Sequence, residues 1–302
     1  MLNAILETRP RRWFAMNASP ALTALLEASA QRKLMPFLGA GFSKNVSREM
    51  PSWHQLIGDA AQRLGYNGLI LQAQADQYQI AEYLDIKNEL GGFYNDLNRS
   101  FHDSKYRMQD SAVHEALCRL DAENVFTTNW DDWIEKAFQH YKIPCHKVVG
   151  VDGLINPKLI ASHGAVAPAH KRFRETTVIK FHGDFSEHSS LVFKETNYHE
   201  RLDFRHPLDI KLLAEALCRS VLFIGYSFTD KNIRYIWHRL RQARKSVHSS
   251  RRPKSFFATF ADNELQRAVF EEMDIETIVL DPTDPDNNLA ALFGEILKAQ
   301  GA

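Results

Sequence analysis

Short apolar runs recur along the chain and predict buried β-strands, each followed by glycine or polar residues. These runs occupy 34–38, 124–127, 177–181, 221–224, 255–260 and 276–280, and a further short run at 146–149 also fits a strand. Between them, apolar residues spaced three or four apart predict helices over 20–32, 51–65, 112–120, 133–140 and 231–244. Alternation of strand and helix along the chain predicts an α/β fold, with a parallel sheet covered by helices on both faces.

Residues 66–120 lack strand patterns and predict a helical insertion above the sheet, which is the best candidate for a lid. Apolar residues keep helical spacing through this block, and Gly91-Gly92 is expected to end one of its helices. We expect residues 1–19 to form a separate arm and residues 20–302 to form one domain. Pro36 lies inside the first predicted strand and cannot donate a hydrogen bond, so that strand must tolerate a gap or start later. Residues 141–175 read as irregular and are expected to drape over a pocket.

The first predicted strand ends in Gly39-Ala40-Gly41-Phe42-Ser43. Two glycines allow a sharp turn and a close approach of the backbone to a ligand. Amide groups at the start of the next helix favour an anion such as a pyrophosphate, although an ordinary strand-to-helix turn explains the pattern equally well. The phosphate-binding P-loop and the dehydrogenase fingerprint are both excluded, because Lys44 stands where each requires glycine.

Three later strands also end in polar or glycine signals. They are Thr127-Thr128-Asn129-Trp130-Asp131, then His182-Gly183, then Gly225-Tyr226-Ser227. Each has a simpler reading, since Asn129 or Asp131 can cap a helix and a histidine is often only structural. Open α/β sheets bind ligands at the carboxyl ends of their strands, so together these signals favour one site.

Composition narrows the class of protein. The chain has 302 residues with 44% hydrophobic content, enough for a full core, and its formal net charge is zero. A neutral chain has no overall field that would draw it to nucleic acid or to a membrane, so nucleic acid is expected to be involved only indirectly. Cys118, Cys145 and Cys218 form no C-x-x-C pair, which favours a reducing compartment and makes a cysteine zinc site unexpected. No apolar run approaches the length of a membrane span, and we expect a cytoplasmic protein.

In this order and spacing, the four motifs resemble those of the sirtuin-like family. The resemblance covers residues 34–262 and implies a Rossmann-like, doubly wound sheet that binds NAD. It implies that the first motif holds the pyrophosphate and that Asn129 and Asp131, beside Thr128, lie at the nicotinamide ribose. It further implies that Gly225 and Ser227 contact the adenosine side and that His182 is the general base. Asp262 matches the adenine-ribose position only loosely.

Two departures from deacylating sirtuins are informative. Their four-cysteine zinc module is missing between residues 183 and 224, which hold only Cys218, and their Pro-Asp-Phe-Arg segment is replaced by Met50-Pro51-Ser52-Trp53. The pattern is therefore more similar to the zinc-less bacterial anti-phage NAD hydrolases. That resemblance implies NAD⁺ as substrate, no zinc, a homo-oligomer, and a partner such as a HerA-type ATPase or an Argonaute-like protein.

The chemistry of the motifs fits cleavage of the bond between nicotinamide and ribose. Asn129 can orient the ribose hydroxyls or a water molecule without adding charge, and a histidine, whose reference pKa is close to neutral, can accept a proton at position 182. Two alternatives stay open: a non-catalytic subunit that binds NAD or ADP-ribose and regulates a partner, and an NAD-dependent protein deacylase.

Overall fold

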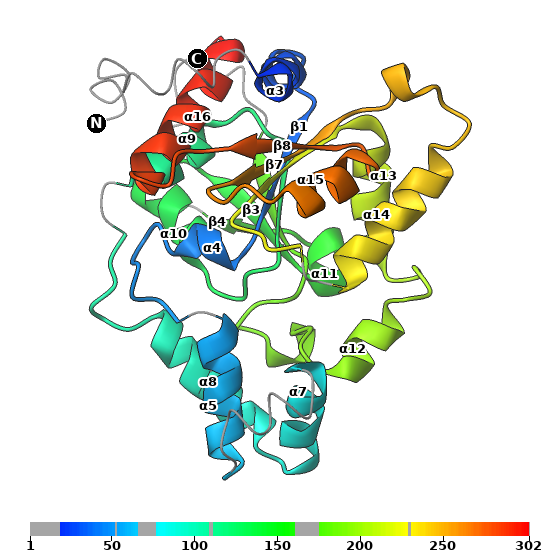
Figure 1. The fold of residues 1–302 in the computed structure, drawn as a ribbon. Helices are drawn as coiled ribbons and strands as arrows, with labels where there is room; N and C mark the ends of the chain where they lie inside the picture. The colour runs from blue at the N-terminus through cyan, green and yellow to red at the C-terminus, as the bar shows by residue number, and fades with distance from the viewer. Residues whose placement is uncertain are drawn as a thin grey trace.

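The structure is a computed structural model that describes residues 19–51, 53–65, 77–108, 111–160, 175–228 and 231–301. These residues form an eight-stranded sheet with the order β4-β3-β5-β2-β1-β6-β7-β8 (Figure 1). The strands are β1 (Leu34–Leu38), β2 (Asn124–Thr127), β3 (Cys145–Val149), β4 (Lys158–Ile160), β5 (Thr176–Lys180), β6 (Ser220–Ile224), β7 (Ser255–Thr259) and β8 (Ile275–Val279). All neighbours in this sheet pair in parallel except β3 and β4. The predicted α/β class with a mostly parallel, doubly wound sheet is confirmed.

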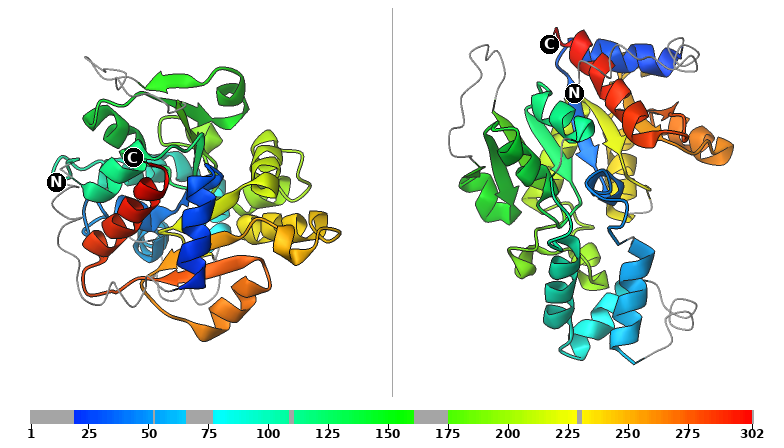
Figure 2. Two further views of the ribbon diagram at one scale, coloured as in Figure 1. Left: turned by 90° about the horizontal axis from the view of Figure 1, so that it is seen from above. Right: turned by 90° about the vertical axis from the view of Figure 1, so that its left-hand side faces the viewer.

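Helices cover both faces of the sheet, as Figures 1 and 2 show. One layer contains α3 (Pro20–Ala30), α9 (Ala112–Arg119), α10 (Trp133–His140) and α16 (Pro285–Ala299), which pack with one face of the sheet in one core. The other face is covered by α13 (Pro207–Cys218), α14 (Lys231–Ala243) and α15 (Glu264–Glu271). Shorter elements are α4 (Ala40–Ser43), α11 (Gly150–Ile155), α12 (Glu195–Glu200) and the 3₁₀ turns η1 (His188–Ser190) and η2 (Ser249–Arg251).

Strand β1 lies at the centre of the sheet and is buried on both faces. Its side chains alternate between the two cores: Leu34 and Leu38 pack in the first, and Met35 and Phe37 in the second. This two-sided burial explains why the run is apolar throughout rather than alternating. Strand β1 includes Pro36 and tolerates the gap that this residue leaves in the hydrogen-bond ladder. Pairing with β2 begins only at Phe37, whereas pairing with β6 covers the whole strand.

A separate helical layer lies beyond the carboxyl ends of the central strands (Figure 1). It consists of α5 (Trp53–Arg63), α7 (Gln77–Ile86) and α8 (Leu90–Phe101), which we call the cap. Its apolar core includes Ile57, Leu84 and Phe93, and it extends to residues of the loops after β2 and β5.

The cap differs at both ends from the expected insertion of residues 66–120. Helix α5 belongs to it, whereas α9 packs against α10 and α16 in a layer on the sheet. The expected helix stop at Gly91-Gly92 is wrong, because both glycines lie in the first turn of α8. The preceding helix α7 ends earlier, and Asn88 takes the left-handed conformation (φ 57°) in the connection. Residues 66–76 lie outside the described part of the chain.

Candidate functional site

The four strand ends singled out in the sequence lie side by side. They follow β5, β2, β1 and β6, which are consecutive in the sheet. Since these strands are parallel, their carboxyl ends face the same edge of the sheet, on the side where the cap lies. The chain leaves β1 toward β2 on one side and returns to place β6 on the other, which is the arrangement that opens a ligand crevice in open α/β sheets.

A cavity of about 310 Å³ opens at this edge. Eight of the predicted site residues line it: Ala40, Gly41, Thr128, Asn129, Asp131, His182, Gly225 and Ser227. Asn129 and His182, which come from different strands and lie 53 positions apart in the numbering, therefore face the same space. The functional roles given to these residues stay predictions.

The amide of Asn129 is held in one orientation by β1 and α4. Its Nδ2 donates to the carbonyl oxygen of Gly39 at 3.1 Å and to Oγ of Ser43 at 2.8 Å. A backbone carbonyl can only accept, so this pairing fixes which end of the amide is nitrogen. Asn129 Oδ1 is buried and has no hydrogen-bond partner within the described part of the chain. The side chain thus offers a fixed acceptor on a residue that lines the cavity.

Ser43 links Asn129 to Asp131. Its hydroxyl accepts from Asn129 and lies 2.9 Å from Oδ2 of Asp131, to which it donates. Asp131 also accepts from the backbone amide of Trp133 at 3.2 Å, at the start of α10. Ser43 is 1% exposed and is not among the residues that line the cavity. The structure therefore places Ser43 behind Asn129, where it supports that side chain; the contact with the pyrophosphate that the resemblance implies stays a prediction.

His182 follows β5, which flanks β2 on the side away from β1, and it lines the cavity from there. Its side chain is 4% exposed, and its ring meets Tyr198 of α12 edge-on with centroids 5.8 Å apart. The backbone carbonyl of His182 accepts from the amide of Val192 at 3.0 Å. Gly183 has φ 86°, and a Cβ there would lie 2.2 Å from the carbonyl oxygen of Ser190. This tight turn returns the chain and fixes the backbone that carries the histidine.

The glycines after β1 and β6 allow the two backbones to touch. A Cβ on Gly39 would lie 2.4 Å from the carbonyl oxygen of Gly225, and a Cβ on Gly225 would lie 2.3 Å from the amide nitrogen of Phe42. The amide of Gly41 donates to the carbonyl of Gly225 at 2.9 Å, and that of Phe42 donates to the carbonyl of Gly39 at 2.8 Å. These two amides are therefore used within the protein and do not form the expected anion cradle.

Four predicted nucleotide-binding residues lie outside the cavity wall: Gly39, Phe42, Ser43 and Asp262. The ring of Phe42 is fully buried in the core under α4, with its centroid 4.7 Å from that of His114. Asp262 follows β7, which is two strands away from β1, and pairs with Arg267 at 3.4 Å. Its contact with the adenine ribose stays a prediction.

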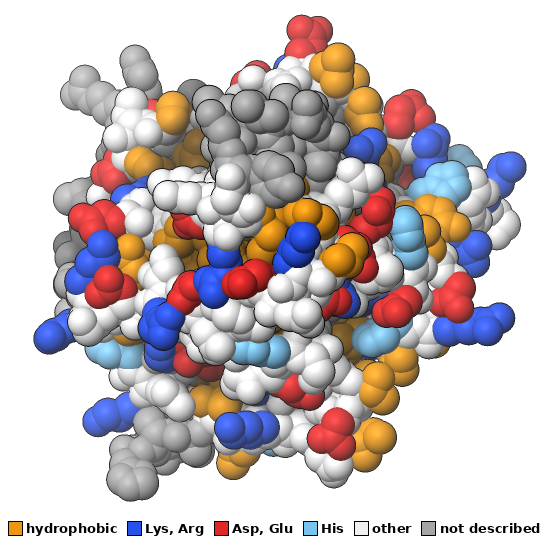
Figure 3. Space-filling view, turned by 90° about the horizontal axis from the view of Figure 1, so that it is seen from below, with side chains coloured by type: hydrophobic (Ala, Val, Ile, Leu, Met, Phe, Trp, Pro, Cys, Tyr) orange, Lys and Arg blue, Asp and Glu red, His pale blue; other side chains and the backbone are white. Residues whose placement is uncertain are grey.

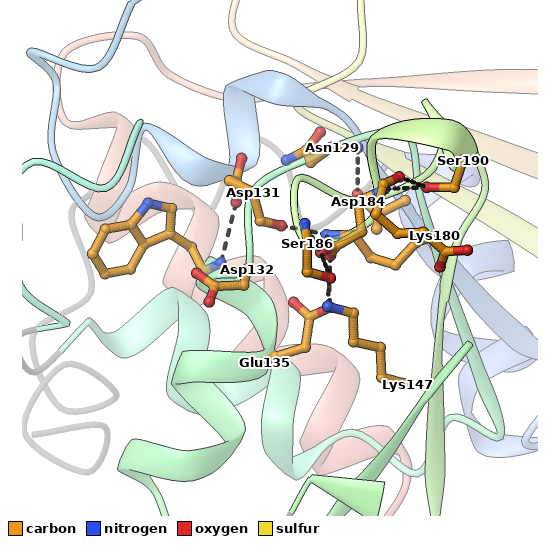
Figure 4. A network of polar contacts seen from close by, with 12 residues as sticks. Asn129, Asp131, Asp132, Glu135, Lys147, Lys180, Asp184, Ser186 and Ser190 are labelled. Atoms are coloured by element: carbon orange, nitrogen blue, oxygen red, sulfur yellow. Dashed lines mark hydrogen bonds and ion pairs between the residues drawn. The ribbon is translucent and has the colours of Figure 1, made fainter. Parts of the chain in front are cut away.

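A buried cluster of four charges supports the loop that carries Asn129 (Figure 4). Nζ of Lys180, at the end of β5, is hydrogen-bonded to the backbone carbonyl of Asp131 and lies 3.2 Å from Asp184 and 3.6 Å from Glu135. Lys147 of β3 completes the cluster, 2.7 Å from Asp184 and 4.0 Å from Glu135. Two cations thus balance two carboxylates.

The cluster shifts the pKa values of its two carboxyl groups in opposite directions. Burial alone would raise the pKa of Asp184, but Lys180 and Lys147 outweigh it and hold that pKa well below its usual range. Burial raises the pKa of Glu135, and the two lysines only partly counter it. Glu135 is therefore the member that depends most on its neighbours to stay ionised.

The cap supplies an apolar wall to the cavity that the sequence motifs did not reveal. Leu56 and Tyr78 come from α5 and α7, Phe101 from the end of α8, and Phe185 and Tyr198 from the segment after His182. Trp130, between Asn129 and Asp131, belongs to the cap core. Sequence reasoning also missed Lys44, although it directly follows the first motif and lines the cavity.

Comparison with known proteins identifies the family of the chain. Residues 123–278 match the SIR2-like domain, and this match covers more than half of the chain. The chain belongs to the SIR2-like domain family. The match includes β2, β5 and β6, and with them three of the four motif-bearing strand ends.

Several curated relatives carry functional names. The chain is 31% identical to the NAD(+) hydrolase ThsA of Enterococcus faecium over 208 residues, which is 68% of this chain and 39% of that protein. It is 29% identical to ThsA of Bacillus cereus (strain MSX-D12) over 258 residues, or 81% of this chain and 50% of that protein. Defense-associated sirtuin 2 of Bacillus subtilis is 25% identical over 235 residues, 76% of this chain and 21% of that protein. The chain therefore matches half or less of the length of these relatives.

Two further properties concern metals and membranes. Within the described ranges, no group of three or more histidine, cysteine, aspartate or glutamate side chains is placed to hold a metal ion. No helix in those ranges is long and apolar enough to span a bilayer.

Charged side chains of both signs are intermixed on the face that Figure 3 shows, which is consistent with the zero net charge of the sequence.

Proposed function

We propose that this SIR2-like chain hydrolyses NAD⁺ to nicotinamide and ADP-ribose. The observation that carries the proposal is the shared cavity, which Asn129, with its fixed acceptor, and His182 both line from two adjacent strand ends. The names of the relatives in Enterococcus faecium and Bacillus cereus support the same reaction.

The reaction breaks the glycosidic C–N bond of NAD⁺ and one O–H bond of water, and it forms one C–O bond. The bond between the nicotinamide nitrogen and C1′ of the ribose breaks, and its electron pair leaves with neutral nicotinamide. The oxygen of a water molecule bonds to C1′ through an oxocarbenium-like transition state, as in glycoside hydrolysis, and releases one proton. Nicotinamide leaves without being protonated, so the protein needs a base and a means of orientation more than an acid.

The side chains of the cavity match these needs. Asn129 Oδ1 accepts a hydrogen bond from a ribose hydroxyl or from the attacking water and fixes its direction. His182 accepts the proton, either from the water or from a ribose hydroxyl. The apolar wall supplied by the cap limits the access of other water molecules, and a drier site strengthens the polar contacts inside it.

We further propose that the activity serves defence against phage, by consuming the NAD⁺ of an infected cell. The support is the resemblance described above and the name of the Bacillus subtilis relative, Defense-associated sirtuin 2. In this proposal the chain works as a homo-oligomer, and a HerA-type ATPase or an Argonaute-like protein acts as its partner.

The proposal is tested with purified protein and NAD⁺, by following the release of nicotinamide by chromatography. The assay is run with the chain alone and with a HerA-type ATPase or an Argonaute-like protein added. We expect Asn129→Ala and His182→Ala each to lower turnover by about 10²–10⁴-fold, the usual contribution of a general base or a comparable catalytic group. Asn156→Ala and His140→Ala are matched controls, because these two residues are exposed and lie outside the cavity, and they should keep full activity.

Three results would contradict the proposal. Normal turnover by both cavity variants would remove the assigned roles. Binding of NAD⁺ without release of nicotinamide in every combination would instead indicate a regulatory binding module. Release of nicotinamide that depends on an added acyl-lysine peptide would indicate a deacylase.

A further inference from the structure

The wall of the cavity contains a single lysine or arginine among the described residues that line it. This residue is Lys44, which follows Ser43 directly and ends α4. Its side chain is half-buried, and no ion pair or hydrogen bond of its ammonium group is formed with another described residue. A lysine that lines a cavity and has no partner among the described residues is available to an anionic ligand.

Two backbone amides and one lysine near the cavity are already occupied. The amides of Gly41 and Phe42 donate to the carbonyl oxygens of Gly225 and Gly39. Lys180 lies behind the wall, outside the lining, and contacts Asp184, Glu135 and the carbonyl of Asp131. The two amides of the glycine turn are therefore not free to donate to a ligand, and the buried lysine is not free to neutralise its charge.

The charges of the cavity wall indicate that a diphosphate needs a cation there. Asp131 lines the cavity and carries a carboxylate, so without Lys44 the ionised side chains of the lining would be negative only. The diphosphate of a dinucleotide brings two further negative charges. A cation within reach is therefore needed to offset the repulsion, and a hydrogen bond between ammonium and phosphate is stronger than one between neutral groups.

The position of Lys44 along the cavity also matches the order of groups in a dinucleotide. From one side to the other, the lining comes from β5 with His182, β2 with Asn129, β1 with Lys44, and β6 with Ser227. In NAD⁺ the diphosphate lies between the two ribose units. A cation from the β1 segment lies between the Asn129 and His182 end and the β6 end, where a diphosphate would fall if the nicotinamide ribose meets Asn129.

We propose that Lys44 binds the diphosphate of the substrate and makes the site selective for dinucleotides over uncharged nucleosides. This inference rests on the proposed function, because it takes the nicotinamide ribose to lie at Asn129 and His182. It assigns the recognition of phosphate to a side chain rather than to the amides of the glycine turn.

The test compares ligands with and without phosphate by isothermal titration calorimetry on the full chain. ADP-ribose carries the diphosphate, and adenosine carries none. We expect Lys44→Gln to weaken binding of ADP-ribose about tenfold, the lower end for a hydrogen bond to a charged group at a partly exposed site, and to leave binding of adenosine unchanged. Lys44→Arg keeps the charge and should stay within about threefold of the wild type.

Lys33→Gln is the matched control. It removes one positive charge from an exposed position just before β1, at the opposite end of that strand from the cavity, and should bind ADP-ribose like the wild type. Raising the salt concentration should weaken binding of ADP-ribose less in Lys44→Gln than in the wild type, because less charge is screened.

The outcomes separate this inference from the proposed function. If the wild type binds ADP-ribose and Lys44→Gln binds it equally well, or if both ligands weaken together, Lys44 does not recognise phosphate, while hydrolysis of NAD⁺ is untouched. If the wild type binds neither ADP-ribose nor NAD⁺, both proposals are lost.

Discussion

Replacing Lys180 by methionine should destabilise the protein strongly, because this lysine holds a buried charge cluster and the loop that carries Asn129. Methionine has a similar volume, so the change removes the charge with little loss of packing. Lys180 is fully buried, and its ammonium group compensates Asp184 at 3.2 Å and Glu135 at 3.6 Å. After the substitution only Lys147 faces two buried carboxylates.

The expected loss in the free energy of unfolding is about 3–5 kcal/mol, the usual cost of leaving a buried charge without its partner. The carbonyl of Asp131 also loses its hydrogen bond. Glu135 offers partial relief, because burial already raises its pKa and it can take up a proton when Lys180 is gone. Adding Glu135→Gln should therefore recover at least about 1 kcal/mol, since the glutamine is neutral from the start.

Urea unfolding at pH 7.5, followed by tryptophan fluorescence, measures the effect. Lys298→Met is the control, because Lys298 pairs with Glu295 at 3.0 Å on the surface and its loss should cost at most about 1 kcal/mol. The reasoning is refuted if Lys180→Met lies within about 1 kcal/mol of the wild type. It is also refuted if Glu135→Gln makes the Lys180→Met protein less stable still.

Two other predictions concern residues near the glycine turn. His114 is fully buried, and burial lowers the pKa of its imidazole to about 3, so the folded protein keeps it neutral while the unfolded chain takes up a proton below about pH 6.5. Between pH 7.5 and 5 this difference should cost the wild type about 2 kcal/mol of stability that His114→Leu does not lose, as urea unfolding at both pH values will show; equal losses would contradict the linkage. Gly225→Ala should destabilise the protein by at least about 2 kcal/mol, because φ is 62° and the new Cβ would lie 2.3 Å from a backbone nitrogen. Gly91→Ala places its Cβ in open space within α8 and should be neutral or stabilise the protein by up to about 1 kcal/mol. Thermal or urea unfolding distinguishes the two glycines, and similar effects would contradict the argument from close approach.

Most of the sheet could be predicted from the sequence because its central strands are buried on both faces. Such strands are short, apolar and ended by glycine or polar residues, as in 34–38 and 221–224. Strand β4 was missed, since it has three residues, lies at the sheet edge and exposes two of them. Gly91-Gly92 misled the prediction because glycine at a helix start and glycine beyond a helix end look alike in sequence, and only packing distinguishes them.

For the candidate site, sequence order indicated which strand ends meet but not which atoms face the cavity. Asn129 and His182 could be recognised from the residues next to them in the sequence, and both line the cavity. The role of Ser43 was not visible, because it depends on bonds to residues 86 and 88 positions away. The aromatic wall was also hidden, since Tyr78 and Tyr198 reach the cavity through the packing of the cap and carry no motif of their own.

The loop that carries Asn129 is fixed from three directions, and this links the fold to the proposed chemistry. Gly39 and Ser43 hold the amide of Asn129 itself, and Lys180 holds the carbonyl of Asp131. Trp130 is held by the rings of Phe185 and Phe193, which follow β5, with centroids 5.7 and 5.3 Å away, and by the ring of Tyr94 in α8 of the cap, with its centroid 6.2 Å away. An acceptor held in this way does not need to reorganise when a substrate arrives, which is how preorganised polar groups contribute to catalysis. A movement of the cap must therefore either carry Trp130 with it or break its ring contact with Tyr94 of α8, so opening of the cavity and placement of Asn129 are mechanically coupled.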